Sequence, residues 1–112
     1  MTIRVVIKRK VKQGQQPKEL VPLILQLRAR AMYQTGYISG ETLYDIDHPG
    51  LCLVISNWKT VNDWNQWASS PERLKIDKRI ETLTGEKTEY RIYSPFSVGT
   101  KTEKKLSIDI QN

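Results

Sequence analysis

At 112 residues, the chain has room for one domain with a single hydrophobic core. Its 38% hydrophobic and 27% charged residues are typical of a globular protein and exclude intrinsic disorder. No stretch approaches the roughly 18 apolar residues of a membrane span, and the N-terminus lacks a secretory signal pattern. Cys52 is the only cysteine, so no internal disulfide can form, and we expect a cytoplasmic protein.

The net charge of +6 raises the possibility of nucleic-acid binding. The basic residues, however, gather at the end of the first predicted strand and in the C-terminal tail. They are Lys8, Arg9, Lys10, Lys12, Lys101, Lys104 and Lys105. In such places basic side chains usually protect strand edges and keep the protein soluble. The charge distribution therefore argues against a phosphate-binding track.

The first half of the chain predicts a strand, a helix and a strand. Residues 2–12 alternate apolar and basic side chains, which is typical of a strand with one buried face. A helix that starts near residue 18 or 19 keeps Pro22 in its opening turn and ends at Gly36. Its apolar stripe is Leu20, Ile24, Leu27 and Ala31. A second strand is predicted at 37–47.

The third predicted strand, residues 51–58, is apolar on both faces. One face carries Leu51, Leu53 and Ile55, and the other carries Cys52, Val54 and Trp58. A strand with two apolar faces has to be covered on both sides.

The remaining elements are two short helices and a fourth strand. Thr60 is a capping residue for a helix that carries Trp64 and Trp67. Ser70 and Pro71 open the last helix, whose stripe is Ile76, Ile80 and Leu83. We expect the charged residues at 72–79 to form a solvated face of this helix. Strand four is predicted at 88–93.

The predicted order β-α-β-β-α-β is that of an α+β, ferredoxin-like fold with an antiparallel sheet and helices on one face. The apolar side chains on the other face of the third strand would each cost about 1.5–3 kcal/mol if left in water. We therefore expect a homodimer, in which the sheets of two copies pack face to face. The domain would span residues 1–95. The tail at 96–112 would be an extra strand or flexible.

Several segments, in this order and spacing, resemble the antibiotic biosynthesis monooxygenase (ABM) family. They are residues 36–43 (GYISGETL), 54–60 (VISNWKT), 64–67 (WNQW), 70–73 (SPER) and 89–93 (EYRIY). The resemblance covers residues 2–95 and implies a dimeric α+β barrel. Family chemistry includes oxidation of phenols, anthrones or quinols by dioxygen without metal or flavin, oxidative heme breakdown, and members without known reaction. The resemblance therefore implies a fold more strongly than an activity.

Oxidation without a cofactor needs an electron-rich substrate, a dry pocket and groups that stabilise the substrate anion. The resemblance assigns Trp58 to the substrate, and its indole N–H can donate a hydrogen bond. A purely structural role for Trp58 is the alternative. Tyr44 is predicted to face the same cavity as a second catalytic candidate, the alternative being a buried tyrosine with a satisfied hydroxyl. Trp64 and Trp67 are predicted core residues, one of which can also wall the pocket and bind the substrate.

Asn57 is a further candidate for substrate binding. Because it precedes Trp58 in a regular strand, it should point to the opposite sheet face. It would there contact a partner subunit or cap the next helix.

The heme-degrading branch of the family uses an asparagine in strand one, a tryptophan ending strand three and a histidine on the last helix. Trp58 matches the tryptophan, whereas the other two positions fall at about Ile7 and Asp77. No histidine occurs at 71–84, and no His, Cys, Asp or Glu cluster has metal-ligand spacing. We therefore expect no heme, metal or other cofactor.

Three functions are compatible with these observations. The first is a cofactor-independent monooxygenase for a small electron-rich aromatic molecule. The second is a non-catalytic dimer that binds a small hydrophobic molecule, favoured by the lack of an obvious base. The third is an RNA-binding module of the same element order. Residues 51–56 (LCLVIS) lack the basic and stacking residues of RNA-recognition domains, so nucleic acid is an unlikely partner.

Overall fold

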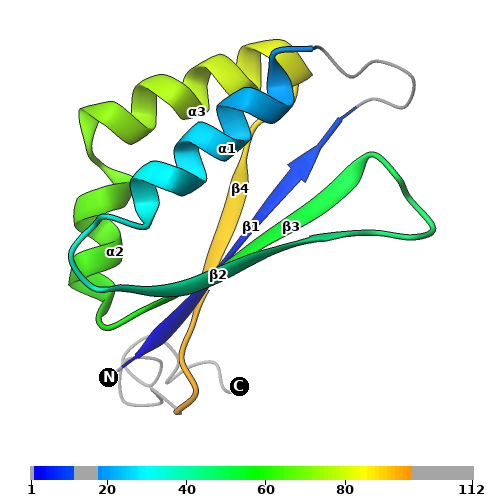
Figure 1. Ribbon diagram of the computed structural model, residues 1–112. Helices are drawn as coiled ribbons and strands as arrows, with labels where there is room; N and C mark the ends of the chain where they lie inside the picture. Colours follow the sequence, from blue (N-terminus) through cyan, green and yellow to red (C-terminus); the bar gives the residue numbers. More distant parts are fainter. Residues whose placement is uncertain (1, 12–17, 97–112) are drawn as a thin grey trace, which may run out of the picture.

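The computed structural model describes residues 2–11 and 18–96. The elements are β1 (Ile3–Lys10), α1 (Leu20–Ala31), β2 (Tyr37–Tyr44), β3 (Leu51–Trp58), α2 (Val61–Ala68), α3 (Pro71–Thr84) and β4 (Glu89–Tyr93). All strands pair antiparallel in the order β2-β3-β1-β4, and the three helices cover one face of the sheet (Figure 1). This confirms the predicted ferredoxin-like α+β fold. The two alternatives for the tail concern residues outside the described part, apart from Phe96.

The core lies between the sheet and the helices. Strand β1 presents one buried face to it, as its alternation predicted, and Trp58 of β3 lies beside that face. The fully or nearly buried apolar residues of the core cluster are Ile3, Val5, Ile7, Leu20, Leu23, Leu27, Trp58, Trp64, Trp67, Ile76 and Ile80. On α1, Leu23 is buried although the predicted stripe ran through Ile24, which is only partly buried. No helix of the described residues is long and apolar enough to cross a membrane.

Strand β2 is shorter than its prediction, which ran to residue 47. It stops at Tyr44 because the next side chain redirects the backbone. The Asp45 carboxylate accepts hydrogen bonds from the backbone N–H groups of Asp47 and His48, at 2.9 and 3.0 Å. A carboxylate that binds its own following backbone forms a turn and competes with strand pairing.

Local capping fixes where α2 and α3 begin, as the sequence predicted. The Thr60 hydroxyl accepts the N–H of Asp63 at 3.0 Å, and the Ser70 hydroxyl accepts the N–H of Arg73 at 3.2 Å. Gly85 ends α3 in a left-handed conformation with φ of 74°. These boundaries determine which side chains of α2 and α3 face the sheet, and thereby the composition of the site described below.

Gly36 connects α1 to β2 with φ of 86°, and a Cβ atom added there would collide with the Asp63 side chain. Gly85 has a similar φ but open space around it. We expect Gly85→Ala to lower the free energy of unfolding by about 1–2 kcal/mol, the cost of a left-handed alanine. Gly36→Ala should cost about 1–3 kcal/mol more, from crowding. Urea unfolding of both variants measures the difference between their free energies of unfolding. Equal losses of stability would contradict the expected collision between a Cβ atom at position 36 and the side chain of Asp63.

Candidate active site

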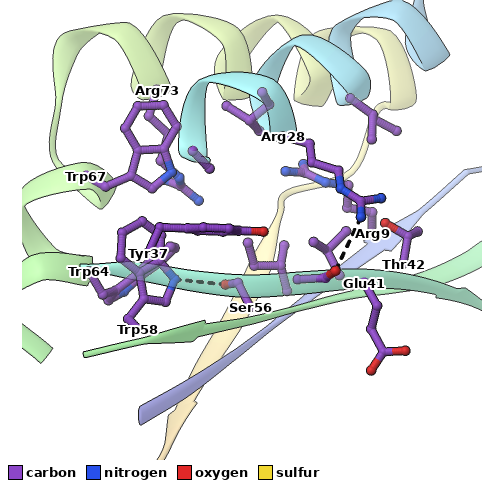
Figure 2. Close-up of a pocket in the computed structure, with 16 residues that line it drawn as sticks. Arg9, Arg28, Tyr37, Glu41, Thr42, Ser56, Trp58, Trp64, Trp67 and Arg73 are labelled. Carbon is purple, nitrogen blue, oxygen red and sulfur yellow. Dashed lines mark hydrogen bonds between the residues drawn. The ribbon is translucent and has the colours of Figure 1, made fainter. Parts of the chain in front are cut away.

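A pocket opens between α1, the start of α3 and the helix-covered face of the sheet (Figure 2). Its aromatic wall consists of Tyr37, Trp58, Trp64 and Trp67. The enclosed volume is about 50 Å³. Because a protein cavity of about 150 Å³ binds benzene, an aromatic molecule enters only if the side chains at the mouth move.

Arg28 of α1 spans the mouth of this pocket. Its guanidinium donates a hydrogen bond to the carbonyl oxygen of Gly40 in β2 at 3.2 Å, and the side chain is otherwise exposed (Figure 2). The side chain of Glu41 is exposed and points away from the pocket, toward the open face of the sheet (Figure 2). One hydrogen bond on an exposed, flexible side chain is weak, so the mouth can open at low energetic cost.

Trp58 is both fully buried and part of the pocket wall, so the core and pocket alternatives for it are compatible. Its ring meets Tyr37 edge-on at 5.4 Å and Trp64 at 5.7 Å between centroids. Its indole N–H donates to the hydroxyl of Ser56 at 2.9 Å. The N–H that the sequence assigned to a substrate is therefore already engaged, and a substrate would have to share it with Ser56.

Trp64 and Trp67 are buried core residues, as the sequence predicted, and both also line the pocket. The Trp64 ring also contacts Tyr90 of β4, with centroids 5.4 Å apart. Its indole Nε1 is buried without a hydrogen-bond partner. A buried N–H without an acceptor is costly and rare, so this group is available to an incoming oxygen atom.

Tyr44 and Asn57 lie outside this pocket. Tyr44 ends β2 and is 70% exposed, because it pairs with Cys52, beyond the pair of Thr42 and Val54 that lines the pocket. Asn57 points to the open face of the sheet, opposite Trp58, as predicted. Its side chain donates to the Ser39 hydroxyl at 3.0 Å and accepts from Arg4 at 3.2 Å. The capping role considered for Asn57 is wrong, because Thr60 caps α2.

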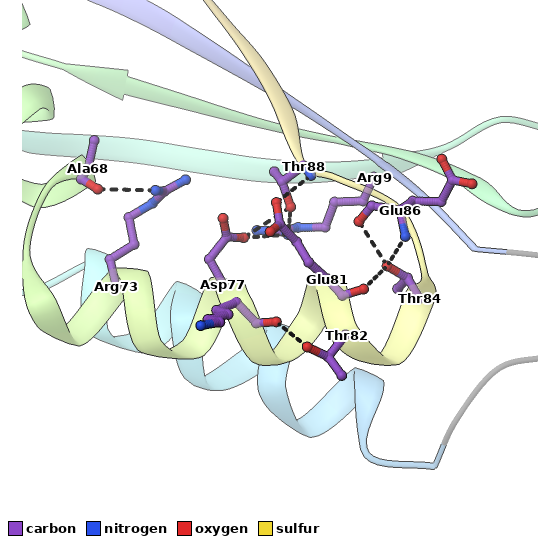
Figure 3. Close-up of polar contacts among 10 residues, drawn as sticks. Arg9, Ala68, Arg73, Asp77, Glu81, Thr82, Thr84, Glu86 and Thr88 are labelled. Atoms are coloured by element: carbon purple, nitrogen blue, oxygen red, sulfur yellow. Dashed lines mark hydrogen bonds and ion pairs between the residues drawn. The ribbon is translucent and has the colours of Figure 1, made fainter.

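Two arginines that the sequence analysis assigned to solvent are buried at this site. Arg9 of β1 and Arg73 of α3 each retain only 4% of their accessible surface, and both line the pocket. Arg9 donates to the Asp77 carboxylate at 3.0 Å and to the Thr88 hydroxyl at 2.9 Å (Figure 3). The expectations of a basic strand edge at Arg9 and of a solvated helix face at 72–79 are therefore wrong for these residues.

The sequence did contain the signals for both arginines. Arg9 follows the parity of Ile3, Val5 and Ile7, so strand alternation places it on the buried face. Arg73 precedes Ile76 and Ile80 by three and seven residues, on the same apolar stripe. The residue type concealed the pattern, because arginine is almost never fully buried unless it is paired.

Arg73 is held mainly by neutral groups. One guanidinium nitrogen donates to the Ala68 carbonyl oxygen at 3.2 Å, and the group lies over the Trp64 ring, 5.2 Å from its centroid. Burial lowers the pKa of Arg73, and the nearby Asp77 carboxylate partly opposes this. Arginine nevertheless keeps its charge in proteins. The site thus combines apolar aromatic walls with buried cationic donors.

Within the described residues, no three His, Cys, Asp or Glu side chains gather closely enough to hold a metal ion. Glu41 is the acidic residue at this pocket, and its carboxylate points away from it (Figure 2). The residues that could contact a bound molecule are thus aromatic rings, guanidinium groups and hydroxyls.

The fold and this pocket define a small α+β domain with an aromatic, cation-bearing site between helices and sheet. The sequence profile of the antibiotic biosynthesis monooxygenase family matches residues 2–79. The chain therefore belongs to that family, as the sequence resemblance indicated. No functionally curated protein matches the sequence.

Solved structures share the fold at low sequence identity. A conserved protein from Methanosarcina mazei Go1 is 24% identical, with a TM-score of 0.73 over 83% of this chain and 91% of that one. SnoaB from Streptomyces nogalater, a cofactor-independent oxygenase, is 15% identical, with a TM-score of 0.73 over 87% and 95%. Rv0793 from Mycobacterium tuberculosis is 12% identical, with a TM-score of 0.73 over 87% and 97%.

Proposed function

We propose that this protein is a cofactor-independent monooxygenase that oxidises a small electron-rich aromatic molecule, such as a phenol or quinol, with dioxygen. One observation carries the proposal: Trp64, whose buried indole N–H has no hydrogen-bond partner, lines an aromatic pocket beside Trp58. Membership of the family and the fold shared with SnoaB support it. The substrate would supply the electrons, so the protein has to bind and stabilise its anion.

The reaction balances without a cofactor. The deprotonated ring passes one electron to dioxygen, and the resulting radical pair joins in a carbon–oxygen bond. Protonation and loss of water then leave a quinone, with one oxygen atom of dioxygen in the ring and the other in water. The N–H of Trp64 would stabilise the charged oxygen, and the aromatic wall would exclude water.

Oxygen uptake with a panel of phenols and quinols tests this function. We expect Trp64→Phe to lower kcat about a hundredfold, the effect of losing one preorganised donor. Trp58→Phe should also lower it, because the smaller ring leaves a gap beside Tyr37 and Trp64. Tyr33→Phe, at a 90% exposed position, is the matched aromatic control and should retain wild-type uptake. Equal, negligible uptake by wild type and Trp58→Phe would count against the proposal.

A non-catalytic binding protein for a small hydrophobic molecule is the second candidate. It is favoured by the position of Glu41, the acidic residue at the pocket, whose exposed carboxylate points away from the pocket and from Trp58 (Figure 2). A catalytic base has to reach the proton that it removes. Tight binding of an aromatic molecule in aerobic buffer without oxygen uptake would establish this function instead.

We also propose that the protein works as a homodimer. The three helices leave the other face of the sheet uncovered by any described element (Figure 1). On that face Leu51, Leu53 and Ile55 remain only half-buried, and Leu43 and Tyr93 are 46% and 50% exposed. A hollow on this face is lined partly by Val6, Leu51, Leu53 and Tyr93. A second sheet packed there would remove these side chains from water.

Light scattering tests the dimer. The wild type should have twice the mass of one chain at micromolar concentration, and Ile55→Asp should have the mass of one, because it buries an unpaired charge between the sheets. Leu25→Asp, at a 58% exposed position on α1, is the control and should remain dimeric. A monomeric wild type would refute this proposal.

The single thiol of Cys52, which needs no oxidising compartment, favours a cytoplasmic location for the dimer.

A further inference from the structure

Three buried side-chain atoms of the described residues lack a hydrogen-bond partner, and all three belong to residues that line the same pocket. They are Nε of Arg9, Nη2 of Arg73 and Nε1 of Trp64. All three atoms are donors. Buried donors are normally satisfied, and exceptions in one place indicate a missing acceptor. The pocket is thus built to receive an atom that accepts hydrogen bonds.

The charges at the pocket indicate that this acceptor is negative. The Arg9 guanidinium and the Asp77 carboxylate form an ion pair at 3.0 Å and cancel each other. Arg73 forms no ion pair within the described part of the chain, and is held by Ala68 and by the face of Trp64. Both guanidinium groups line the pocket, whereas the nearby carboxylates of Asp77 and Glu81 are not among the residues that line it. The Arg73 guanidinium is thus a buried cation without a directly paired carboxylate. Such a group is costly to bury, and an anion bound beside it would lower that cost.

We infer that the ligand of this pocket is an aromatic anion, whose ring packs against the tryptophans and whose charged oxygen binds the guanidinium of Arg73. A phenolate and a ring-bound carboxylate share this chemistry. The inference rests on the proposed function in using the same pocket, and it names the substrate class. In Figure 2, Arg9 and Arg73 reach from β1 and α3 into the space between sheet and helices, beside the aromatic wall.

Calorimetric binding under argon tests the inference without any turnover. Benzoate and benzamide are a charged and a neutral ligand of the same shape. Pentafluorophenol, which is ionised at neutral pH, and neutral pentafluorotoluene form the second pair. We expect the wild type to bind at least one anion about 10- to 100-fold more tightly than its neutral partner, the range for a charged hydrogen bond. The pair that shows the preference identifies the anionic group.

Variants of one helix show whether Arg73 is responsible. Arg73→Met should abolish the preference for the anion, and Arg73→Lys should retain part of it, because the charge remains while the planar fork is lost. Arg79→Met removes the same charge from the exposed face of α3 and should bind as the wild type does. Thermal unfolding of each variant establishes that it is folded.

The inference is overturned if the wild type binds charged and neutral ligands equally or not at all, or if the preference survives in Arg73→Met. These failures are separable from failure of the proposed oxygenase. An anion preference without oxygen uptake would refute the oxygenase alone, whereas oxygen uptake and an anion preference that both survive in Arg73→Met would refute this inference alone.

Discussion

Asp77→Asn is expected to lower the free energy of unfolding by about 3–5 kcal/mol, the usual cost of removing one partner from a buried ion pair. The Asp77 carboxylate is 13% exposed and accepts from both Arg9 and Thr88, at 3.0 and 3.1 Å. Without its charge, the guanidinium of Arg9 has no ion-pair partner, and the neighbouring Arg73 has lost the stronger of the two carboxylate charges that oppose its desolvation. Two buried cations would then share one site with Glu81 as the nearby carboxylate that remains.

Denaturant unfolding measures this loss, with Glu72→Gln as the control. Glu72 lies on the same helix and forms an ion pair with Arg30, in which both side chains are more than 40% exposed. The same carboxylate-to-amide change should cost less than about 1 kcal/mol there, because surface pairs contribute little. If both variants lost equally little stability, the buried cluster would not have the electrostatic importance assigned to it.

Arg73→Leu is expected to have the opposite sign and to raise the free energy of unfolding by about 1–4 kcal/mol, as replacement of buried ionic groups by apolar ones often does. Leucine removes a buried charge that forms no ion pair within the described residues, together with the unpartnered Nη2 atom, and it continues the apolar stripe of Ile76 and Ile80. The variant loses the contact of the guanidinium with Trp64 and its hydrogen bond to Ala68, which limits the gain.

The matched control for this variant is Arg79→Leu, on the exposed face of the same helix. It should change the stability by no more than about 0.5 kcal/mol. A clear loss of stability in Arg73→Leu would mean that Arg73 is a structural residue whose packing outweighs its charge. A gain would mean that the native protein retains a destabilising cation, which is typical of residues kept for function.

The variants Asp77→Asn and Arg73→Leu change the charge of one buried cluster in opposite directions. Removing the charge of Asp77 leaves the guanidinium groups of Arg9 and Arg73 without a directly paired carboxylate, and removing the charge of Arg73 leaves the ion pair of Arg9 and Asp77 intact. Figure 3 shows how the polar side chains of β1, α3 and the segment before β4 meet at this cluster. Since ligand binding and folding stability depend on the same buried guanidinium group of Arg73, the anion inferred above should also stabilise the wild type.

The order of elements, the central position of β1 and β3 and the helix starts could be predicted from the sequence. Each follows from interactions between neighbours along the chain. Strand alternation gave the buried face of β1, and the hydroxyls of Thr60 and Ser70 fixed the first residues of α2 and α3. The resemblance to the family is also confirmed, because the short segments that carry it lie in the elements that build the sheet and the helices.

The composition of the site was decided by the tertiary structure. Trp58 was identified, but Tyr44 lies outside the pocket because its register with Cys52 places it beyond the lining residues Thr42 and Val54. Arg9 and Arg73, which sequence reasoning assigned to solvent, are buried in it. A charged residue is placed inside a core only by partners that are distant in the chain, here Asp77 for Arg9 and the ring of Trp64 for Arg73. Periodicity reports which face a side chain takes, whereas the pairing that makes a buried charge tolerable exists only once β1 and α3 have packed together.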